Sequence, residues 1–341
     1  MKILYGLSGD GYGHSSRAKV VGEYLKAWGH TVKMLTYGRA VNVLKNNYDI
    51  FEVTGMEIQY AQGELKKRAT LANGFEMIKK NALQWKRFHH MMQAFDPDLF
   101  ISDMEPIVPI LRFWRGKPLI CIDNQHRMTH LDLDVPRTYM KDFIIARTVV
   151  ENFVAKADHF IITSFAEAPI IRKNTTIVPP VIRQEVQAVS PVYGEKILVY
   201  LTRENRRVLD ILKGFKEKFV VFGYDEDKVE ENLEFKKRDH FLDELTRCRA
   251  IIATAGFTLM SEALYLKKPY LALPLNGQFE QVLNSLFLKA SGYGDYSDEL
   301  TPEEVAFFLS HLDPYRSALA DYRLDFDKLP ETLKKVIADI H

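Results

Sequence analysis

The chain alternates short apolar runs with helical segments almost throughout, and this alternation restricts the fold to few classes. The first series of such runs occupies residues 2–7, 31–36, 50–53, 99–102, 119–122, 159–163 and 176–178. A second series occupies residues 195–201, 219–223, 250–253 and 270–273. Strands separated by helices pair in parallel, because each crossover helix returns the chain to the same end of the sheet. The sequence therefore predicts an α/β fold with two doubly wound sheets in tandem.

Chain length and turn residues predict where these two units divide. At 341 residues the chain exceeds the size that one hydrophobic core usually supports. Paired prolines and further turn residues interrupt both periodicities over residues 179–194, which we expect to link the units. The expected domains are residues 1–180 and 181–313, followed by a charged helical tail, residues 314–341.

Composition excludes several classes of function. The formal net charge is +1, which gives no case for binding nucleic acid. The two cysteines, Cys121 and Cys248, have neither a CxxC motif nor a histidine partner nearby, so we expect reduced thiols and no zinc site. No run approaches the roughly 20 apolar residues of a membrane span, and the first residues do not form a signal peptide. We therefore expect a cytoplasmic protein.

One segment is a candidate for contact with the inner face of a membrane. Residues 85–92, WKRFHHMM, form a basic and aromatic cluster on an expected helix over residues 72–95. The alternative is a half-buried helix with a solvated basic face.

A glycine-rich turn follows the first expected strand. It reads GLSGDGYGH and places Gly9, Gly11 and Gly13 before His14. Glycines reach positive φ and admit a ligand against the backbone, and the helix that follows favours an anion at its N-terminus. The spacing lacks the last glycine of the dinucleotide fingerprint, which disfavours nicotinamide binding. The alternative is that the glycines only form a tight turn.

A second small-residue turn, Thr254-Ala255-Gly256, follows the expected strand at residues 250–253. Glu262 lies in the apolar helix that comes next, where a carboxylate needs a partner. Ribose hydroxyls are one such partner, and the alternative is a glutamate on the helix surface.

Two segments resemble known enzymes. Residues 255–294, AGFTLMSEALYLKKPYLALPLNGQFEQVLNSLFLKASGYG, resemble the donor-binding signature of GT-B glycosyltransferases, in particular the family 28 group that includes the peptidoglycan N-acetylglucosaminyltransferase. MKILYGLSGDGYGHSSRA, residues 1–18, resembles the glycine-rich loop and histidine of the same superfamily, especially of a poorly characterised bacterial and archaeal group. The resemblance implies two Rossmann-like domains facing a cleft, the first binding acceptor and the second binding donor, with the tail bracing the first domain.

The resemblance also implies roles for residues of the second domain. The expected donor-binding residues are the backbone of Ala255, Gly256 and Phe257 at the diphosphate, Glu262 at the ribose, and Glu280 and Gln281 at the sugar. Arg203 is expected at the phosphates for a different reason, because a diphosphate needs a cation and relatives often carry glycine and serine at this turn. The alternative for Arg203 is a solvated basic helix start. The peptidoglycan enzyme has a glutamine where this chain has Glu280. An added carboxylate beside a diphosphate sugar is unfavourable without a compensating group, so the transferred sugar is expected to differ from N-acetylglucosamine.

Transfer to an acceptor hydroxyl requires a general base. His14 is the first candidate, because imidazole exchanges protons near neutral pH. Asp103 and Glu105 follow the strand at residues 99–102 and are expected at the same edge, where Asp103 orients His14 and Glu105 is an alternative base. Asp10 is a further candidate. The competing interpretation of both carboxylates is that they cap the helix that starts near Pro106.

The implied activity is transfer of a hexose from a nucleotide-diphosphate sugar, with UDP the expected nucleotide, to a hydroxyl of a glycan, a lipid-linked or a small-molecule acceptor in cell-envelope synthesis. Neither a metal nor a cofactor is expected beyond the nucleotide-sugar co-substrate. A basic stretch, residues 60–72, is expected over the acceptor or as a disordered loop. The alternatives are a nucleotide-sugar hydrolase or epimerase of the same fold, and a non-catalytic sugar-nucleotide-binding protein.

Overall fold

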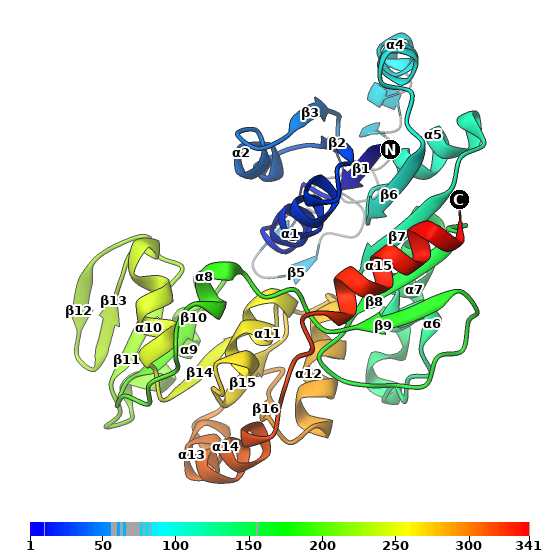
Figure 1. The fold of residues 1–341 in the computed structure, drawn as a ribbon. Coiled ribbons are helices and arrows are strands. Elements are labelled where there is room, and N and C mark those ends of the chain that lie inside the picture. Colours follow the sequence, from blue (N-terminus) through cyan, green and yellow to red (C-terminus); the bar gives the residue numbers. More distant parts are fainter. Residues whose placement is uncertain are drawn as a thin grey trace. The chain divides into compact units, whose positions relative to one another are not determined.

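The computed structural model describes all residues except 10, 56–59, 62–63, 66–75, 78, 82, 155 and 341. Asp10 and most of the basic stretch at residues 60–72 therefore lie outside the described residues. The chain forms two compact units, each with a seven-stranded sheet (Figure 1). The first unit comprises Met1–Val181 and Asp325–His341, and the second comprises Ile182–Leu324. The chain thus passes between the units twice.

The first sheet is parallel throughout, with strand order β3-β2-β1-β6-β7-β8-β9. Its order reverses between β1 and β6, which are neighbours although they are distant in sequence. In doubly wound sheets such a switch point is where ligands bind. The strands are β1 (Lys2–Leu7), β2 (Thr31–Thr36), β3 (Asp49–Glu52), β6 (Leu99–Asp103), β7 (Leu119–Asp123), β8 (His159–Thr163) and β9 (Thr175–Val178).

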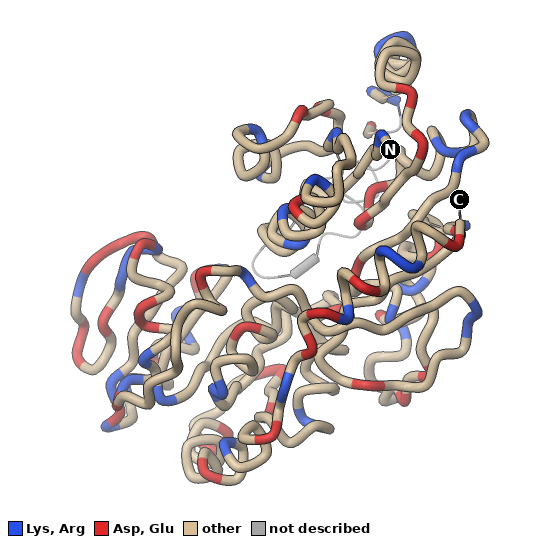
Figure 2. The backbone as a smooth tube through the Cα atoms, in the orientation of Figure 1, with Lys and Arg blue, Asp and Glu red and all other residues tan. Residues whose placement is uncertain are grey.

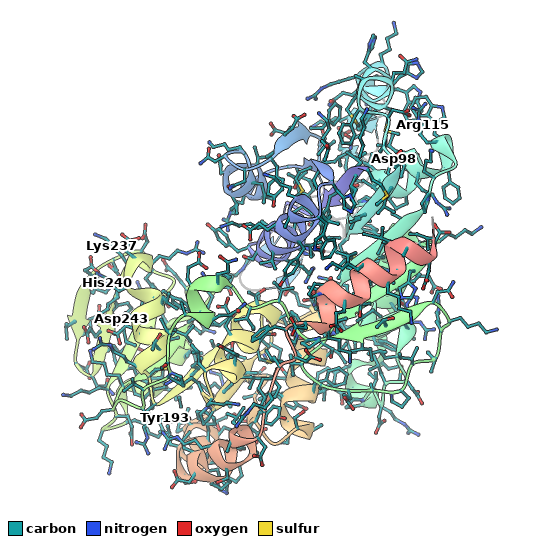
Figure 3. All side chains as sticks on the ribbon, in the orientation of Figure 1. Asp98, Arg115, Tyr193, Lys237, His240 and Asp243 are labelled. Atoms are coloured by element: carbon teal, nitrogen blue, oxygen red, sulfur yellow. The ribbon has the colours of Figure 1, made fainter. Side chains whose placement is uncertain are left out.

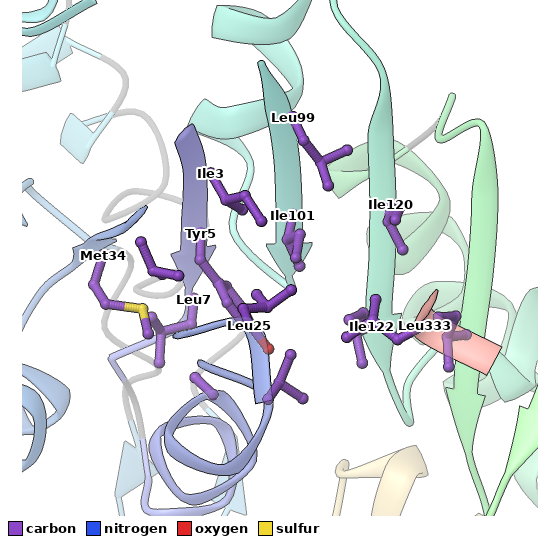
Figure 4. Packing of buried hydrophobic residues seen from close by; sticks show 14 of the residues in the cluster. Ile3, Tyr5, Leu7, Leu25, Met34, Leu99, Ile101, Ile120, Ile122 and Leu333 are labelled. Atoms are coloured by element: carbon purple, nitrogen blue, oxygen red, sulfur yellow. The ribbon is translucent and has the colours of Figure 1, made fainter. Parts of the chain in front are cut away.

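Helices of the first unit cover both faces of this sheet, because its strands are apolar on both sides. On one face, Ile3, Tyr5 and Leu7 pack with side chains of α1, α2 and α15 (Figure 4). On the other face, Leu4 packs with side chains of α4 and α5. The helices are α1 (Gly13–Ala27), α2 (Arg39–Leu44), α4 (Trp85–Phe95), α5 (Ile107–Arg115), α6 (Arg127–His130), η1 (Arg137–Tyr139), α7 (Met140–Phe153) and α15 (Lys328–Asp339). A short hairpin joins β4 (Tyr60–Ala61) and β5 (Glu64–Leu65).

The second unit repeats this plan with strand order β12-β13-β11-β10-β14-β15-β16, and its switch point lies between β10 and β14. Only the β12–β13 pair among the named strands of this sheet is antiparallel. The strands are β10 (Ile197–Tyr200), β11 (Phe219–Phe222), β12 (Lys228–Glu230), β13 (Leu233–Phe235), β14 (Ala250–Thr254), β15 (Tyr270–Leu273) and β16 (Gly294–Tyr296). The helices are α8 (Gln184–Gln187), α9 (Arg206–Lys213), η2 (Arg238–His240), α10 (Phe241–Arg247), α11 (Phe257–Tyr265), α12 (Phe279–Ala290), α13 (Pro302–Ser310) and α14 (Leu312–Ala320).

The C-terminal segment belongs to both units in turn. Leu312 at the start of α14 is part of the second unit's core, so the returning segment begins at Asp325 rather than at residue 314. In α15, Leu329, Leu333, Val336 and Ile337 are buried in the core of the first unit. Because burying an aliphatic side chain contributes about 1.5–3 kcal/mol, α15 is an integral part of the first unit.

Lysine, arginine, aspartate and glutamate residues are interspersed along the backbones of both units (Figure 2). This distribution accords with the formal net charge of +1.

Candidate functional site

The loop between β1 and α1 contains the predicted glycines. Gly9 packs so closely that an added Cβ would lie 1.9 Å from the carbonyl oxygen of Tyr37. Gly11 has a φ of +81°, in the left-handed region that favours glycine, and Gly13 is the first residue of α1. Backbone packing and turn geometry therefore account for Gly9 and Gly11. The approach of a ligand to this loop stays a prediction.

His14 and Asp103 meet at the switch point of the first sheet. Leu7 of β1 lies opposite Asp103 of β6, and the Ser8 N–H donates to the Asp103 carbonyl over 3.0 Å. The Nδ1 atom of His14 lies 2.6 Å from Oδ1 of Asp103. A carboxylate at this distance holds the ring proton on Nδ1 and leaves Nε2 as the nitrogen that accepts a proton. The carboxylate is fully buried, whereas 15% of the His14 side chain is exposed, so the imidazole is accessible.

Arg17 completes this arrangement, although no sequence motif singled it out. It lies three residues after His14 on α1 and binds both oxygens of Asp103, Nε to Oδ2 at 2.8 Å and Nη2 to Oδ1 at 2.6 Å. Its Nη1 donates to Oδ1 of Asn124, in the loop after β7, over 3.2 Å. Burial alone lowers the pKa of an arginine, but the adjacent Asp103 raises the pKa of Arg17. The guanidinium therefore stays charged in the interior.

Glu105 caps a helix, which is the competing interpretation of this residue. Its Oε2 accepts the backbone N–H groups of Ile107 and Val108, at 3.0 and 2.8 Å, in the first turn of α5. Burial raises the pKa of Glu105 to about 7, although these two hydrogen bonds oppose the change. Of the two predicted carboxylates, Asp103 is thus the one in contact with His14. The contacts of Glu105 support a structural role.

A second carboxylate–imidazole pair follows the neighbouring strand β7. His126 Nδ1 lies 2.7 Å from Oδ2 of Asp123, and the Cys121 thiol donates to the same oxygen over 3.1 Å. The sequence-based statement that Cys121 has no histidine partner is therefore wrong, because His126 Nδ1 lies 3.5 Å from its sulfur. Ligand atoms of these three buried residues lie close enough to hold a metal ion. Their mutual hydrogen bonds use Nδ1 of His126, whereas its buried Nε2 has no hydrogen-bond partner among the described residues. Burial raises the pKa of Cys121 well above its ordinary value.

In the second unit, the predicted donor-binding turn begins α11. Gly256 is the residue before the helix, and its N–H donates to the Thr254 carbonyl over 2.8 Å. The carbonyl of Ala255 accepts from Asn284 of α12, also over 2.8 Å, and Phe257 is the buried first residue of α11. These contacts fix the turn at the C-terminal end of β14.

Arg203 occupies the equivalent position after β10, the strand next to β14. Hydroxyl groups of Thr202 and Thr254 join these two strand ends at 2.6 Å. The switch point of the second sheet therefore brings Arg203 and the Gly256 turn to one edge. This is the position of ligand sites in doubly wound sheets.

Glu262 has a protein partner that the sequence did not indicate. The carboxylate is almost fully buried, and its two oxygens accept from Nε and Nη2 of Arg183, at 2.6 and 2.8 Å. Arg183 directly precedes α8 and its side chain is 37% exposed. The predicted need of Glu262 for a partner is thus met by Arg183, and a ribose that reached this carboxylate would share it with the guanidinium.

Gln281 and Glu280 lie in the first turn of α12. The Gln281 side chain accepts from the N–H of Leu275 at 3.0 Å and donates to Gln278 at 2.6 Å, so it stabilises the loop before the helix. Contact of these residues with a donor stays a prediction.

The basic and aromatic cluster at residues 85–92 forms part of an apolar surface on α4 and α5. The indole rings of Trp85 and Trp114 stack with their centroids 4.8 Å apart. We call this the α4–α5 surface; its exposed apolar residues are Leu83, Trp85, Ile110, Phe113 and Trp114. Arg115 lies on α5 beside this surface (Figure 3). Within the described part of the chain, no helix is both long enough and apolar enough to cross a membrane.

Comparison with known families decides the relationship of the chain. A family profile described as "Glycosyl transferase family 1" matches residues 1–313. The chain belongs to this glycosyltransferase family. The expected GT-B relationship is therefore confirmed, whereas the match is not specifically to family 28.

Relatives and solved structures agree with this assignment. An uncharacterized glycosyltransferase of Methanosarcina mazei is 24% identical, and the match covers 89% of this chain and 88% of the relative. The glycosyltransferase of kitacinnamycin has a similar structure, with a TM-score of 0.69, 14% identity and 93% of each chain covered. Glycosyltransferase VinC, solved in complex with dTDP, has a TM-score of 0.67, 13% identity and 99% of each chain covered. The family 1 protein thus has the GT-B fold that the sequence predicted.

Proposed function

We propose that this family 1 glycosyltransferase moves a hexose from a nucleoside-diphosphate sugar to an acceptor hydroxyl, with His14 as the general base. The observation that supports this role is the 2.6 Å contact between Nδ1 of His14 and the buried carboxylate of Asp103. Nε2 takes the proton of the hydroxyl as its oxygen bonds to the anomeric carbon. The bond from that carbon to the diphosphate breaks, and the nucleoside diphosphate leaves with the electron pair.

The second unit is proposed to bind the donor. Arg203 and the N-terminus of α11 lie at neighbouring strand ends, where a guanidinium and a helix dipole together favour a diphosphate. We propose that these groups neutralise the leaving group without a metal ion. UDP is the expected nucleotide, and the dTDP bound by VinC makes dTDP the first alternative.

The acceptor is proposed to be lipid-linked and presented at the inner face of a membrane during cell-envelope synthesis. The α4–α5 surface supports this proposal, because exposed tryptophan, phenylalanine and isoleucine side chains lie beside basic ones. Aromatic rings of this kind partition to the interface between headgroups and acyl chains. Glycan and small-molecule acceptors are the other classes to be screened.

The test begins with calorimetric titration of UDP, dTDP, GDP and their common sugar conjugates, with and without EDTA. We expect one nucleotide to bind in the presence of EDTA, and His14→Ala to bind it with unchanged affinity but to lose transfer. Binding that requires a metal ion would contradict the metal-independent mechanism. If no nucleotide binds, the proposed transfer activity is refuted.

Two outcomes separate the competing functions. Release of free sugar without any acceptor, or interconversion of the sugar, identifies a hydrolase or an epimerase. Donor binding with neither transfer nor hydrolysis across glycan, lipid-linked and small-molecule acceptors identifies a sugar-nucleotide-binding protein.

A further inference from the structure

The Asp103 carboxylate accepts hydrogen bonds from two side chains, His14 and Arg17. It therefore differs from a carboxylate that binds only a histidine. Its Oδ1 accepts both from Nδ1 of His14 and from Nη2 of Arg17, each at 2.6 Å, and its Oδ2 accepts Nε of Arg17. Arg17 and Asp103 are both buried. The negative charge of Asp103 is therefore matched by a permanent positive charge before His14 takes up a proton.

Two opposite charges lie next to His14. Nη2 of Arg17 lies 3.3 Å from Nδ1 of His14, and Oδ1 of Asp103 lies 2.6 Å from the same nitrogen. The guanidinium opposes a second positive charge on the imidazole, whereas the carboxylate favours one. Removing the guanidinium would leave the charge of Asp103 unopposed at His14.

Arg17 also fixes the direction of the carboxylate. The planar guanidinium binds Asp103 through two parallel hydrogen bonds, a geometry that allows little rotation. The third nitrogen, Nη1, is held by Asn124 from the loop after β7. The arginine thus joins the ends of α1, β6 and β7.

We propose that Arg17 is a positioning residue for the transfer reaction: it fixes Asp103 against His14 and offsets the charge of that carboxylate at the imidazole. This inference rests on the proposed function, in which His14 is the base. The arginine acts through Asp103 and His14 and need not touch the substrate.

Other titratable groups surround this cluster and must be accounted for. Burial, and then Asp103, raise the pKa of Tyr5 on β1 well above its ordinary value, so this phenol stays neutral near pH 7. Glu105, whose pKa is about 7, titrates in the same range as a histidine. Among the described residues, Tyr48 acts on Tyr5, and Asp123 of the β7 cluster acts on Arg17. Cys121 and His126 are hydrogen-bonded to Asp123.

The test compares Arg17→Met, Arg17→Lys and a matched control, Lys26→Met, which removes an exposed cation from the same helix. All variants also carry Glu105→Gln, because the Glu105 carboxyl titrates near pH 7 and would obscure the protonation of His14. Protonation of His14 is followed by NMR of labelled histidine, assigned by its loss in His14→Ala. In Arg17→Met we expect the midpoint of His14 protonation, and the acid limb of the rate profile, to move up by about one pH unit or more.

Arg17→Lys separates charge from geometry. It keeps a cation at Asp103 but loses the paired hydrogen bonds, so we expect the acid limb to stay in place while kcat falls about tenfold at unchanged donor affinity. Lys26→Met should match its parent in both measurements. A lysine variant with the parental kcat would refute the positioning role.

The outcomes distinguish this proposal from the proposed function. If Arg17→Met is folded and His14 protonates at the same pH as in the parent, the proposed effect on the imidazole is refuted. If Arg17→Met does not fold, the kcat of Arg17→Lys decides. If the unmodified protein transfers no sugar, the proposed function fails, whereas the NMR midpoint still supports or refutes the effect of Arg17 on His14.

Discussion

Replacing Glu105 with glutamine should remove a pH-dependent destabilisation of the first unit. The carboxyl is fully buried, and burial raises its pKa from 4.5 to about 7. The folded state therefore binds this proton more tightly than the unfolded state. The contribution of this carboxyl to the free energy of unfolding is greatest below about pH 4.5, falls as pH rises to about 7, and is constant above that value. The difference between the two pKa values corresponds to about 3 kcal/mol, at about 1.4 kcal/mol per pH unit.

Glutamine is the appropriate replacement, because its side-chain oxygen can still accept the N–H groups of Ile107 and Val108. All three tryptophans, Trp28, Trp85 and Trp114, belong to the first unit. Urea unfolding followed by tryptophan fluorescence therefore reports on this unit selectively. Between pH 4.5 and pH 8 the unmodified protein should lose about 3 kcal/mol relative to Glu105→Gln.

The same variant separates the two interpretations of Glu105. If it acts as a helix cap, Glu105→Gln retains transfer activity at pH 7. Parallel pH dependence of stability in the two proteins would refute the reasoning from burial. Loss of transfer in a folded Glu105→Gln protein would instead identify Glu105 as the general base and contradict the assignment of His14.

Three further predictions concern the other sites. His14→Ala should lower kcat about 10²- to 10⁴-fold with unchanged donor affinity in calorimetry, and a smaller loss would contradict its role as base. Arg183→Met should destabilise the second unit by about 2 kcal/mol in circular dichroism, because it leaves Glu262 buried without its partner; adding Glu262→Gln should restore most of this loss, and no recovery would indicate a different cause. Trp85→Ser with Phe113→Ser should weaken sedimentation with phosphatidylglycerol vesicles at least about tenfold, whereas Val229→Ser, at a more exposed apolar site on β12, should not.

Most of the fold could be predicted, because buried parallel strands are continuous apolar runs. The first expected strand and β1 coincide, and β3 differs from its prediction by one residue at each end. The short strands β12, β13 and β16 escaped prediction, since KVE, LEF and GDY carry no apolar run. Their place in the sheet depends on neighbouring strands rather than on local propensity.

Site residues that directly follow a strand could be predicted from the sequence. Residues that reach the site only through tertiary contacts could not. His14 and Asp103 come together because β1 and β6 are adjacent at the switch point, as the alternation of elements indicates. An arginine on an amphipathic helix is usually solvated, so Arg17 gave no signal. Arg183 lies 79 residues from its partner Glu262 and reads as part of a linker. Such long-range ion pairs are set by tertiary structure alone.

Because α15 returns to the first unit, the order in which the two units can finish folding differs from the order in which the chain enters them during synthesis. Residues 1–181 leave the ribosome before α15 exists, so the part of the first sheet that packs against Leu333 lacks this helix until residues 328–339 have been made. The second unit is one continuous stretch and has all its residues earlier. The unit encoded later can thus close first, and the unit that holds His14 is completed last. The unit that is proposed to hold the catalytic base can therefore be completed only after all residues of the proposed donor-binding unit have been made.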